Sequence, residues 1–179
     1  MRAVLDACVL YPSVLREILL GVAARGGLTP LWSARLLGEW QRAAARLGPE
    51  GEAIASGEIA RLRADWPEAE IAADPSVEAR LWLPDPADAH VLATAIAGQA
   101  AWIITLNLRD FPSRVLGPEG VRAQSPDDFL MARWLENARR VESAVQEAHE
   151  RTEAASGRAQ DLRALLKRAR LPRLGKALG

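Results

Sequence analysis

The hydrophobic positions of the first 130 residues follow two alternating patterns. Short apolar runs at 3–5, 28–32 and 101–105 are typical of strands buried on both faces, and residues 115–116 and 121–123 offer a last edge strand. The segments between these runs repeat their apolar residues every three or four positions, as amphipathic helices do. Strands that alternate with helices predict a parallel sheet with helices on both faces.

Capping signals predict where the first helices begin and end. Ser13 and Ser33 each precede a periodic apolar stretch and are predicted N-caps. Gly26-Gly27 and Gly48-Pro49 end these two helices, and a third helix is expected over 50–65.

The C-terminal third is predicted to be helical. Residues 125–128, Ser-Pro-Asp-Asp, combine an N-cap with a proline and two acids in the first turn, and they predict one long helix toward residue 154. Gly157 breaks this helix, and a basic helix of about twelve residues is expected next. We therefore expect an α/β body over 1–130 and a helical extension with a basic tail over 131–179.

Composition narrows the class of protein. The chain has 179 residues, of which 49% are apolar, and these values predict a single soluble domain with a real core. It contains no long uncharged apolar run, so no membrane association is expected, and charges near Met1 argue against a secretory signal and favour the cytoplasm. Because Cys8 is alone, an internal disulfide framework and a cysteine-based zinc site are excluded.

The net charge of zero conceals an asymmetry. Residues 1–150 carry 21 acidic and 15 basic side chains, whereas residues 151–179 carry 2 acidic and 8 basic ones. An acidic body with a basic tail predicts either contact with a polyanion or folding of the tail onto the body.

Polar residues with metal-ligand chemistry gather in the stretch 83–112. Asp85 and Asp88 precede an apolar helix, and Asn107 and Asp110 follow the next strand. In an open α/β sheet, sites form beyond the carboxyl ends of strands, so these side chains are expected to lie near one another. Carboxylates gathered in this way repel each other unless a cation lies among them, and a hard divalent ion is the best candidate.

Two further acids belong to the same prediction. Asp6 ends the first strand, and Glu39 lies on a helix that such a topology can bring to the same rim. Four carboxylates from distant segments are a usual way to hold Mg²⁺ or Mn²⁺, which would polarise a phosphodiester and activate water. No nucleophile constellation, glycine-rich phosphate loop or zinc-binding helix competes with this interpretation.

Each residue also has a simpler explanation. Asp85 and Asp88 are equally suited to capping a helix, and Glu39 taken alone is a solvated helix residue. Asp110 suits a turn, and His90 is expected to be structural or on the surface rather than a ligand. The joint pattern favours the metal site.

At these residues the sequence resembles the PIN-domain family, in particular the VapC-type toxins of bacterial toxin–antitoxin pairs. The resemblance covers residues 2–130 and rests on blocks at 4–10, 32–33, 39–40, 83–93, 104–112 and 124–130. It implies a three-layer α/β/α sandwich around a central parallel sheet, followed here by the C-terminal helical extension.

The resemblance also implies roles for individual residues. The metal-binding and catalytic acids would be Asp6, Glu39, Asp88 and Asp110, with Asp85 as an alternative or companion to Asp88, and with Thr105 and Asn107 orienting these carboxylates. Two departures from the family pattern bear on this set. Cys8 stands where many members have an asparagine, which weakens support for Asp6, and Asn107 stands where many have an acid, which shifts the role to Asp110.

Two functions follow. The first is a Mg²⁺- or Mn²⁺-dependent endoribonuclease, the toxin of a toxin–antitoxin pair, whose implied partners are an RNA substrate, a cognate antitoxin and a second copy in a homodimer. The alternative is a catalytically weak RNA- or protein-binding module that uses the basic tail. In that tail Arg163, Lys167 and Arg170 are predicted to share one helix face.

Overall fold

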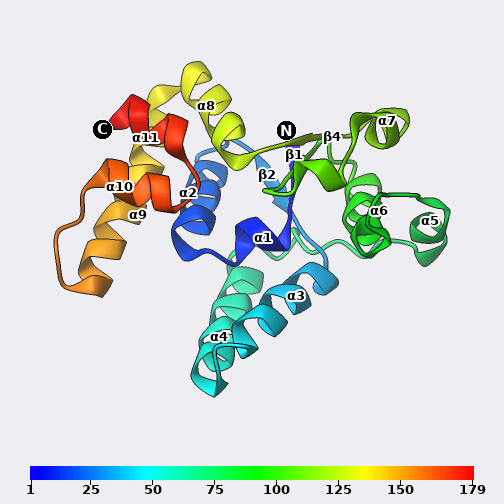
Figure 1. Cartoon of the computed structure of the whole chain (residues 1–179), viewed down its shortest axis with the longest axis horizontal. Coiled ribbons are helices and arrows are strands. Elements are labelled where there is room, and N and C mark those ends of the chain that lie inside the picture. The colour runs from blue at the N-terminus through cyan, green and yellow to red at the C-terminus, as the bar shows by residue number, and fades with distance from the viewer.

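Four short parallel strands form the centre of the computed structural model, which describes residues 1–179 (Figure 1). The strands are β1 (Arg2–Leu5), β2 (Thr29–Leu31), β3 (Trp102–Ile104) and β4 (Arg122–Gln124). They lie in the order β2-β1-β3-β4, and every neighbouring pair is parallel. The prediction of an α/β fold around a parallel sheet is therefore confirmed.

Strand β1 has the next strand of the chain, β2, on one side and the later strand β3 on the other. Val4 of β1 pairs with Leu31 of β2 on one side and with Ile103 of β3 on the other. The chain thus leaves β1 toward one edge and returns on the opposite edge, which makes the carboxyl ends of β1 and β3 a topological switch point. In open α/β sheets this is where a crevice opens for ligands.

Eleven α-helices and three 3₁₀ helices complete the chain. The α-helices are α1 (Ala7–Leu10), α2 (Ser13–Ala24), α3 (Ala34–Ala45), α4 (Pro49–Asp65), α5 (Pro75–Arg80), α6 (Ala89–Ala97), α7 (Ser113–Leu116), α8 (Pro126–Glu136), α9 (Ala138–Ser156), α10 (Leu162–Arg168) and α11 (Pro172–Leu178). The 3₁₀ helices are η1 (Pro86–Asp88), η2 (Leu108–Asp110) and η3 (Gly117–Glu119).

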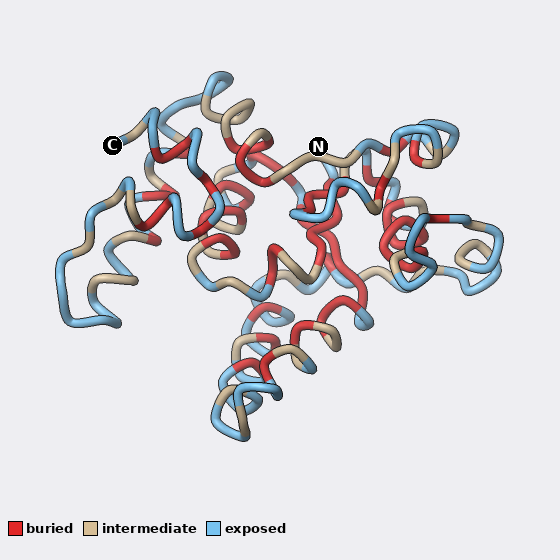
Figure 2. The backbone as a smooth tube through the Cα atoms, viewed as in Figure 1, coloured by how far each residue is buried: buried red, intermediate tan, exposed pale blue.

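The elements form three layers. Helix α6 contacts β1 and β3, while α2 lies on the other side of the strands and carries α9 on its outer face (Figure 1). The central strand is buried on both faces, with Ala3, Val4 and Leu5 fully enclosed (Figure 2). This is the α/β/α sandwich that the sequence predicted, and it explains why the strands are continuous apolar runs.

The C-terminal helices share the core of the body. Val141 of α9, Leu166 of α10 and Leu174 of α11 are buried within the same hydrophobic cluster as the strands. Helix α11 also contacts α8, so the tail folds back onto the protein. The division of the chain at residue 130 stays a prediction, and helix α8 runs across that position.

The capping predictions for the first helices had different outcomes. Ser33 is an N-cap, because its side chain accepts a hydrogen bond from the Leu36 N–H. The prediction for Ser13 was wrong, since Pro12 occupies the N-cap position and no side chain caps α2.

The prediction of strand structure at 115–116 was wrong. These residues belong to α7, which begins after Pro112 and closes a turn through the bond from Leu116 N–H to the Pro112 carbonyl. Proline fixes φ near the helical value and starts a turn readily, and two apolar residues are too few to oppose it. The edge strand is β4, at the second of the two predicted places.

The single long helix predicted from Pro126 to residue 154 is two helices. Asn137 interrupts it with an extended backbone, and its side chain caps the following helix by accepting from the Arg140 N–H. Asparagine favours this competing bond over an internal helical position. The break redirects α9 so that its apolar face packs on α2.

The basic tail is also divided. Helix α10 has seven residues instead of about twelve, because Arg170 takes a left-handed conformation (φ 64°) and ends it. A last helix, α11, then begins at Pro172.

Candidate metal centre

The carboxyl ends of β1 and β3 place Asp6 and Thr105 side by side. Leu5 pairs with Ile104, so the residues that follow them are neighbours across the switch point. The Thr105 hydroxyl donates to Asp6 Oδ2 over 2.6 Å, and both side chains are buried. No hydrogen bond engages Asp6 Oδ1, which leaves one carboxylate oxygen for a ligand.

A second donor reaches the same oxygen of Asp6. The Cys8 thiol lies 3.2 Å from Asp6 Oδ2 and accepts from the Leu106 N–H. The Asn107 N–H in turn donates to the Thr105 hydroxyl, so backbone amides of the loop after β3 orient both donors. Cys8 therefore keeps a hydrogen bond to Asp6, although a thiol is a weaker donor than an amide. Asn107 contributes through its backbone, and its side chain is exposed.

Asp85 and Asp88 have different local roles. Asp85 is the N-cap of η1 and accepts from the Ala87 N–H over 2.9 Å. Asp88 precedes α6 but makes no capping hydrogen bond. Its carboxylate is therefore the freer of the two to bind a ligand.

Three other aspartates lie close enough to Asp88 to affect its pKa. Burial, and after it the charges of Asp6, Asp85 and Asp110, raise the pKa of Asp88 from 3.8 to about 6. Four aspartates from three separate segments are thus close enough to affect one another. Burial and like charges both disfavour the charged form of a carboxyl group, so a bound cation would stabilise this cluster.

Asp110 ends η2 after a single turn. Its nearest cation is Arg109, whose Nε lies 3.7 Å from Asp110 Oδ1 and whose side chain is almost fully exposed. An exposed pair of this kind contributes little, so the carboxylate remains available.

Glu39 reaches the site from α3 and has its own partners. His90 Nε2 lies 2.9 Å from Glu39 Oε1, and Arg35 Nε lies 3.8 Å from the same oxygen. Glu39 is not among the charges that raise the pKa of Asp88. The structure thus gathers the four aspartates together, whereas Glu39 is bonded to His90, which follows Asp88 by two residues.

These donors fit a hard divalent cation by their chemistry. All are carboxylates, Asp6 Oδ1 and the Asp88 carboxylate make no hydrogen bond, and mutual repulsion raises the pKa of Asp88. In this structure no group of three or more His, Cys, Asp or Glu side chains is arranged so that it could hold a metal ion. An open group of acids at a strand edge suits an ion that keeps part of its water.

A comparison with family models decides the classification. Residues 2–109 match the model of the PIN domain, which is more than half of the chain. The protein belongs to the PIN-domain family. The matched range contains every candidate acid except Asp110, which follows its last residue.

A local similarity points to one branch of this family. The chain is 48% identical over 44 residues to the protein named putative ribonuclease VapC50 of Mycobacterium tuberculosis (strain ATCC 25618 / H37Rv). This match covers 25% of the present chain and 26% of that protein. No solved structure matches the chain significantly.

The basic residues of the tail lie apart from the acids in the fold. Arg163 and Lys167 are exposed on α10, whereas Arg170 follows the helix in its left-handed conformation. The prediction that all three share one helix face was wrong, because α10 ends before it reaches Arg170. None of the three forms an ion pair with a carboxylate of the chain.

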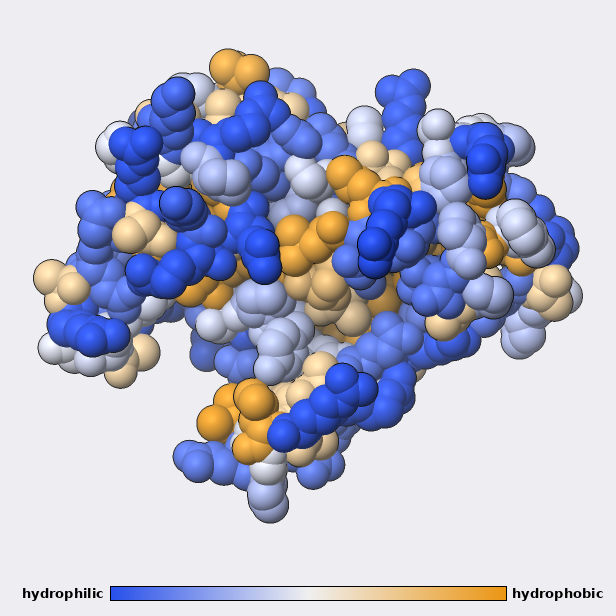
Figure 3. Space-filling view, in the orientation of Figure 1, coloured by the Kyte–Doolittle hydropathy of each residue, from blue (hydrophilic) through white to orange (hydrophobic).

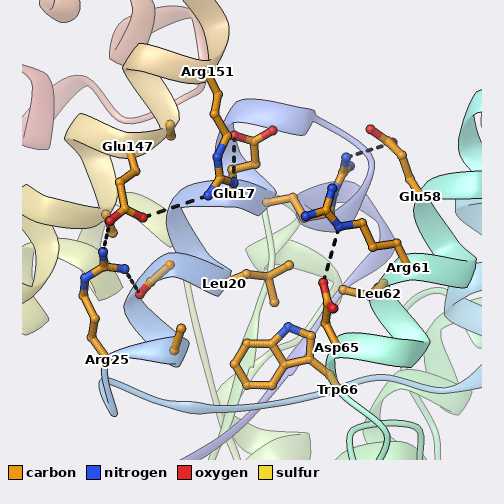
Figure 4. A pocket seen from close by; sticks show the side chains of 15 residues that line it. Glu17, Leu20, Arg25, Glu58, Arg61, Leu62, Asp65, Trp66, Glu147 and Arg151 are labelled. Atoms are coloured by element: carbon orange, nitrogen blue, oxygen red, sulfur yellow. Dashed lines mark hydrogen bonds and ion pairs between the residues drawn. The ribbon is translucent and has the colours of Figure 1, made fainter.

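A second polar region of this PIN-domain protein is a cavity of about 520 Å³ between α2, α4 and α9 (Figure 4). Its charged residues pair with one another, as Arg25 does with Glu147 and Arg16 with Glu58. The cavity therefore contains four basic and four acidic side chains, unlike the group of aspartates. None of the candidate acids lines it.

The chain also provides no helix that is both long and apolar enough to cross a membrane. Exposed apolar side chains are scattered among charged ones on the face shown in Figure 3.

The sequence left open whether His90 is structural or on the surface. It is 3% exposed and bonded to Glu39, so the structural alternative is confirmed. The available signal was its place in the first turn of a strongly apolar helix, since a buried imidazole requires a polar partner. The identity of that partner depended on the folded positions of α3 and α6 and was not visible in the sequence.

Proposed function

We propose that this PIN-domain protein is a divalent-metal-dependent endoribonuclease that hydrolyses RNA phosphodiesters. The observation that supports this proposal is the group of Asp6, Asp85, Asp88 and Asp110 at the switch point between β1 and β3. A group of partly buried, uncompensated carboxylates destabilises the protein, and a bound cation removes this cost.

Asp6, Asp88 and Asp110 would hold Mg²⁺ or Mn²⁺, with Asp85 as a companion and Glu39 as the acid from α3. A bound ion of this kind activates water and stabilises the leaving oxygen of a phosphodiester. The protein's own part is to fix the carboxylates, which Thr105 and Cys8 do for Asp6.

We further propose that the protein is the toxin of a toxin–antitoxin pair in the cytoplasm. The local similarity to a protein named as a VapC ribonuclease supports this role. An antitoxin that inhibits the enzyme would place an Arg or Lys side chain near the aspartates, where the charge is uncompensated. A homodimer belongs to the same proposal.

The test is cleavage of a mixed RNA pool by the purified protein, free of any copurifying antitoxin, with Mg²⁺ or Mn²⁺ and with EDTA. Asp6→Asn keeps the shape of the side chain and removes its charge, so it should abolish cleavage without unfolding the protein. Asp161→Asn is the matched control, because Asp161 caps α10 among the C-terminal helices. Equal activity of wild type and Asp6→Asn would contradict the proposal.

A second candidate function is RNA or protein binding through the basic tail without catalysis. The exposed cations Arg163, Lys167 and Arg170, none of them paired with a carboxylate, favour it. Binding of labelled RNA would then be unchanged in Asp6→Asn and lost when these three residues are replaced by glutamine. Its salt dependence would decrease with the same three substitutions.

A further inference from the structure

The imidazole of His90 is enclosed between α3 and α6. His90 lies in the first turn of α6 and is 3% exposed. Its Nε2 atom lies 2.9 Å from Glu39 Oε1, and the ring makes no other polar contact within the protein. A buried imidazole without a partner is costly, so the bond to Glu39 is what allows His90 to occupy this position.

The other ring nitrogen shows which atom carries the proton. His90 Nδ1 is buried and has no hydrogen-bond partner. A carboxylate only accepts hydrogen bonds, so Nε2 must be the donor to Glu39. A second proton on Nδ1 would leave a buried N–H unpaired, and the neutral ring with its proton on Nε2 therefore fits the surroundings best.

Competing partners of Glu39 are weak. Arg35 Nε is 3.8 Å away, and the guanidinium of Arg35 is engaged by Glu78 at 2.8 Å and by the Ala87 carbonyl at 3.2 Å. The Glu39 side chain is 32% exposed, so packing alone does not fix its conformation. The short bond from His90 is thus the main constraint on the direction of this carboxylate.

The position of His90 in the chain links Glu39 to the group of aspartates that includes Asp88. His90 follows Asp88 by two residues and lies in the first turn of the helix that Asp88 precedes. The imidazole thus contacts Glu39 of α3, while the backbone of His90 lies at the start of α6, next to Asp88.

We propose that His90 is a positioning residue: its Nε2–H holds the Glu39 carboxylate in place beside Asp6, Asp88 and Asp110. This inference rests on the proposed metal-dependent function and adds a residue to it. Without His90, Glu39 would turn into solvent and the site would lose its acid from α3.

Three substitutions separate this role from simple packing. His90→Gln places an amide N–H close to the position of Nε2, so it keeps the donor. The shorter amide of His90→Asn reaches only the position of Nδ1. This variant therefore loses the donor to Glu39, although its side chain is about as polar as that of His90→Gln. Glu39→Gln removes the charge that the donor positions. His149→Asn is the control, because His149 is a partly buried histidine of α9 bonded to the Gln160 carbonyl.

The measurement is Mn²⁺ affinity by titration calorimetry of the purified full-length variants, together with their thermal stability. His90→Asn should weaken Mn²⁺ binding about 10-fold, which is the lower end of the effect of a residue that orients a metal ligand. His90→Gln and His149→Asn should bind within about 3-fold of wild type. In the Glu39→Gln background His90→Asn should cause no further loss, because its effect passes through Glu39.

Additive losses in the double variant, or unchanged Mn²⁺ affinity of His90→Asn, would overturn the inference. Absence of Mn²⁺ binding by the wild type would instead overturn the proposed function. In that case the His90–Glu39 bond is tested without metal by denaturation. The midpoints are compared for four proteins: wild type, His90→Asn, Glu39→Gln and the double variant. Non-additive midpoints support the bond, and additive midpoints reject it.

Discussion

The Thr105 hydroxyl donates to Asp6 Oδ2 over 2.6 Å, although the two residues are 99 positions apart in the chain. The two residues are the first after the neighbouring strands β1 and β3, so the strand register itself creates the contact. The Asn107 N–H donates to the Thr105 hydroxyl and thereby directs its proton toward Asp6. One oxygen of Asp6 is fixed and the other is left open.

Thr105→Val tests this contact, because valine keeps the branched shape and removes the donor. We expect Mn²⁺ affinity to fall about 10- to 100-fold, as it does when a group that orients a metal ligand is lost. Thr105→Ser keeps the hydroxyl and should stay near wild type. Calorimetric titration measures both, and a Thr105→Val protein that binds Mn²⁺ normally would show that Asp6 needs no orientation.

The thiol of Cys8 should be unreactive. Burial, and after it the charge of Asp6, raises the pKa of Cys8 from 9.0 to about 12. Because the thiolate is the reactive species, alkylation at pH 8 should be about 1000-fold slower than for a free cysteine. The rate of iodoacetamide labelling, followed by mass spectrometry, measures this in the folded protein and in denaturant. Rapid labelling of the folded protein would mean that the loop after β3 opens.

Asp88 should destabilise the metal-free protein near neutral pH. Its pKa is raised in the folded state from 3.8 to about 6, so the folded protein binds this proton more strongly than the unfolded chain does. The stability associated with Asp88 is therefore present below about pH 4 and is lost as the pH rises through about 6.

Asp88→Asn should remove this dependence and raise the stability of the metal-free protein at pH 7. A shift of this size corresponds to about 3 kcal/mol at most, and solvent screening of the half-buried carboxylate reduces it to about 1 kcal/mol. The melting temperature should rise by about 2–4 °C. Thermal unfolding in EDTA at pH 4 and pH 7 measures the effect, and Mg²⁺ should stabilise the wild type but not the variant. A lower melting temperature for Asp88→Asn would contradict the assignment.

Asp127 should anchor the last helix. Its buried carboxylate accepts from the backbone N–H groups of Arg173 (2.9 Å) and Leu174 (3.0 Å), so a residue of α8 caps the start of α11. Asp127→Ala leaves both N–H groups unpaired and should cost about 1–3 kcal/mol. Hydrogen exchange should increase in 172–178 and remain unchanged in β1 and β3.

Asp128→Ala serves as the comparison for that experiment. Asp128 pairs with the Arg173 side chain on the exposed surface and not with the helix backbone. Its loss should affect exchange in α11 much less, because an exposed ion pair contributes little. Equal effects of the two substitutions would show that the charge on Arg173, and not the backbone cap, holds the helix.

The sequence by itself determined the alternation of strands and helices, and it pointed to the candidate acids. The strands β1 and β3 are buried on both faces. A strand in such a position needs a continuous run of apolar residues, and this run can be recognised in the sequence. The acids were recognisable as candidates because Asp6 directly follows a strand, Asp88 precedes a helix, and Asp110 lies in the loop after a strand. These are local properties, set by the nearest few residues.

The tertiary structure decided which of these residues touch and how. The break at Asn137 and the end of α10 at Arg170 depend on competing hydrogen bonds and packing that no local periodicity contains. The partnership of His90 with Glu39, and that of Thr105 with Asp6, joins segments that are far apart in the chain. Such contacts arise from the register of the strands and the packing of helices on the sheet, so only the folded chain establishes them.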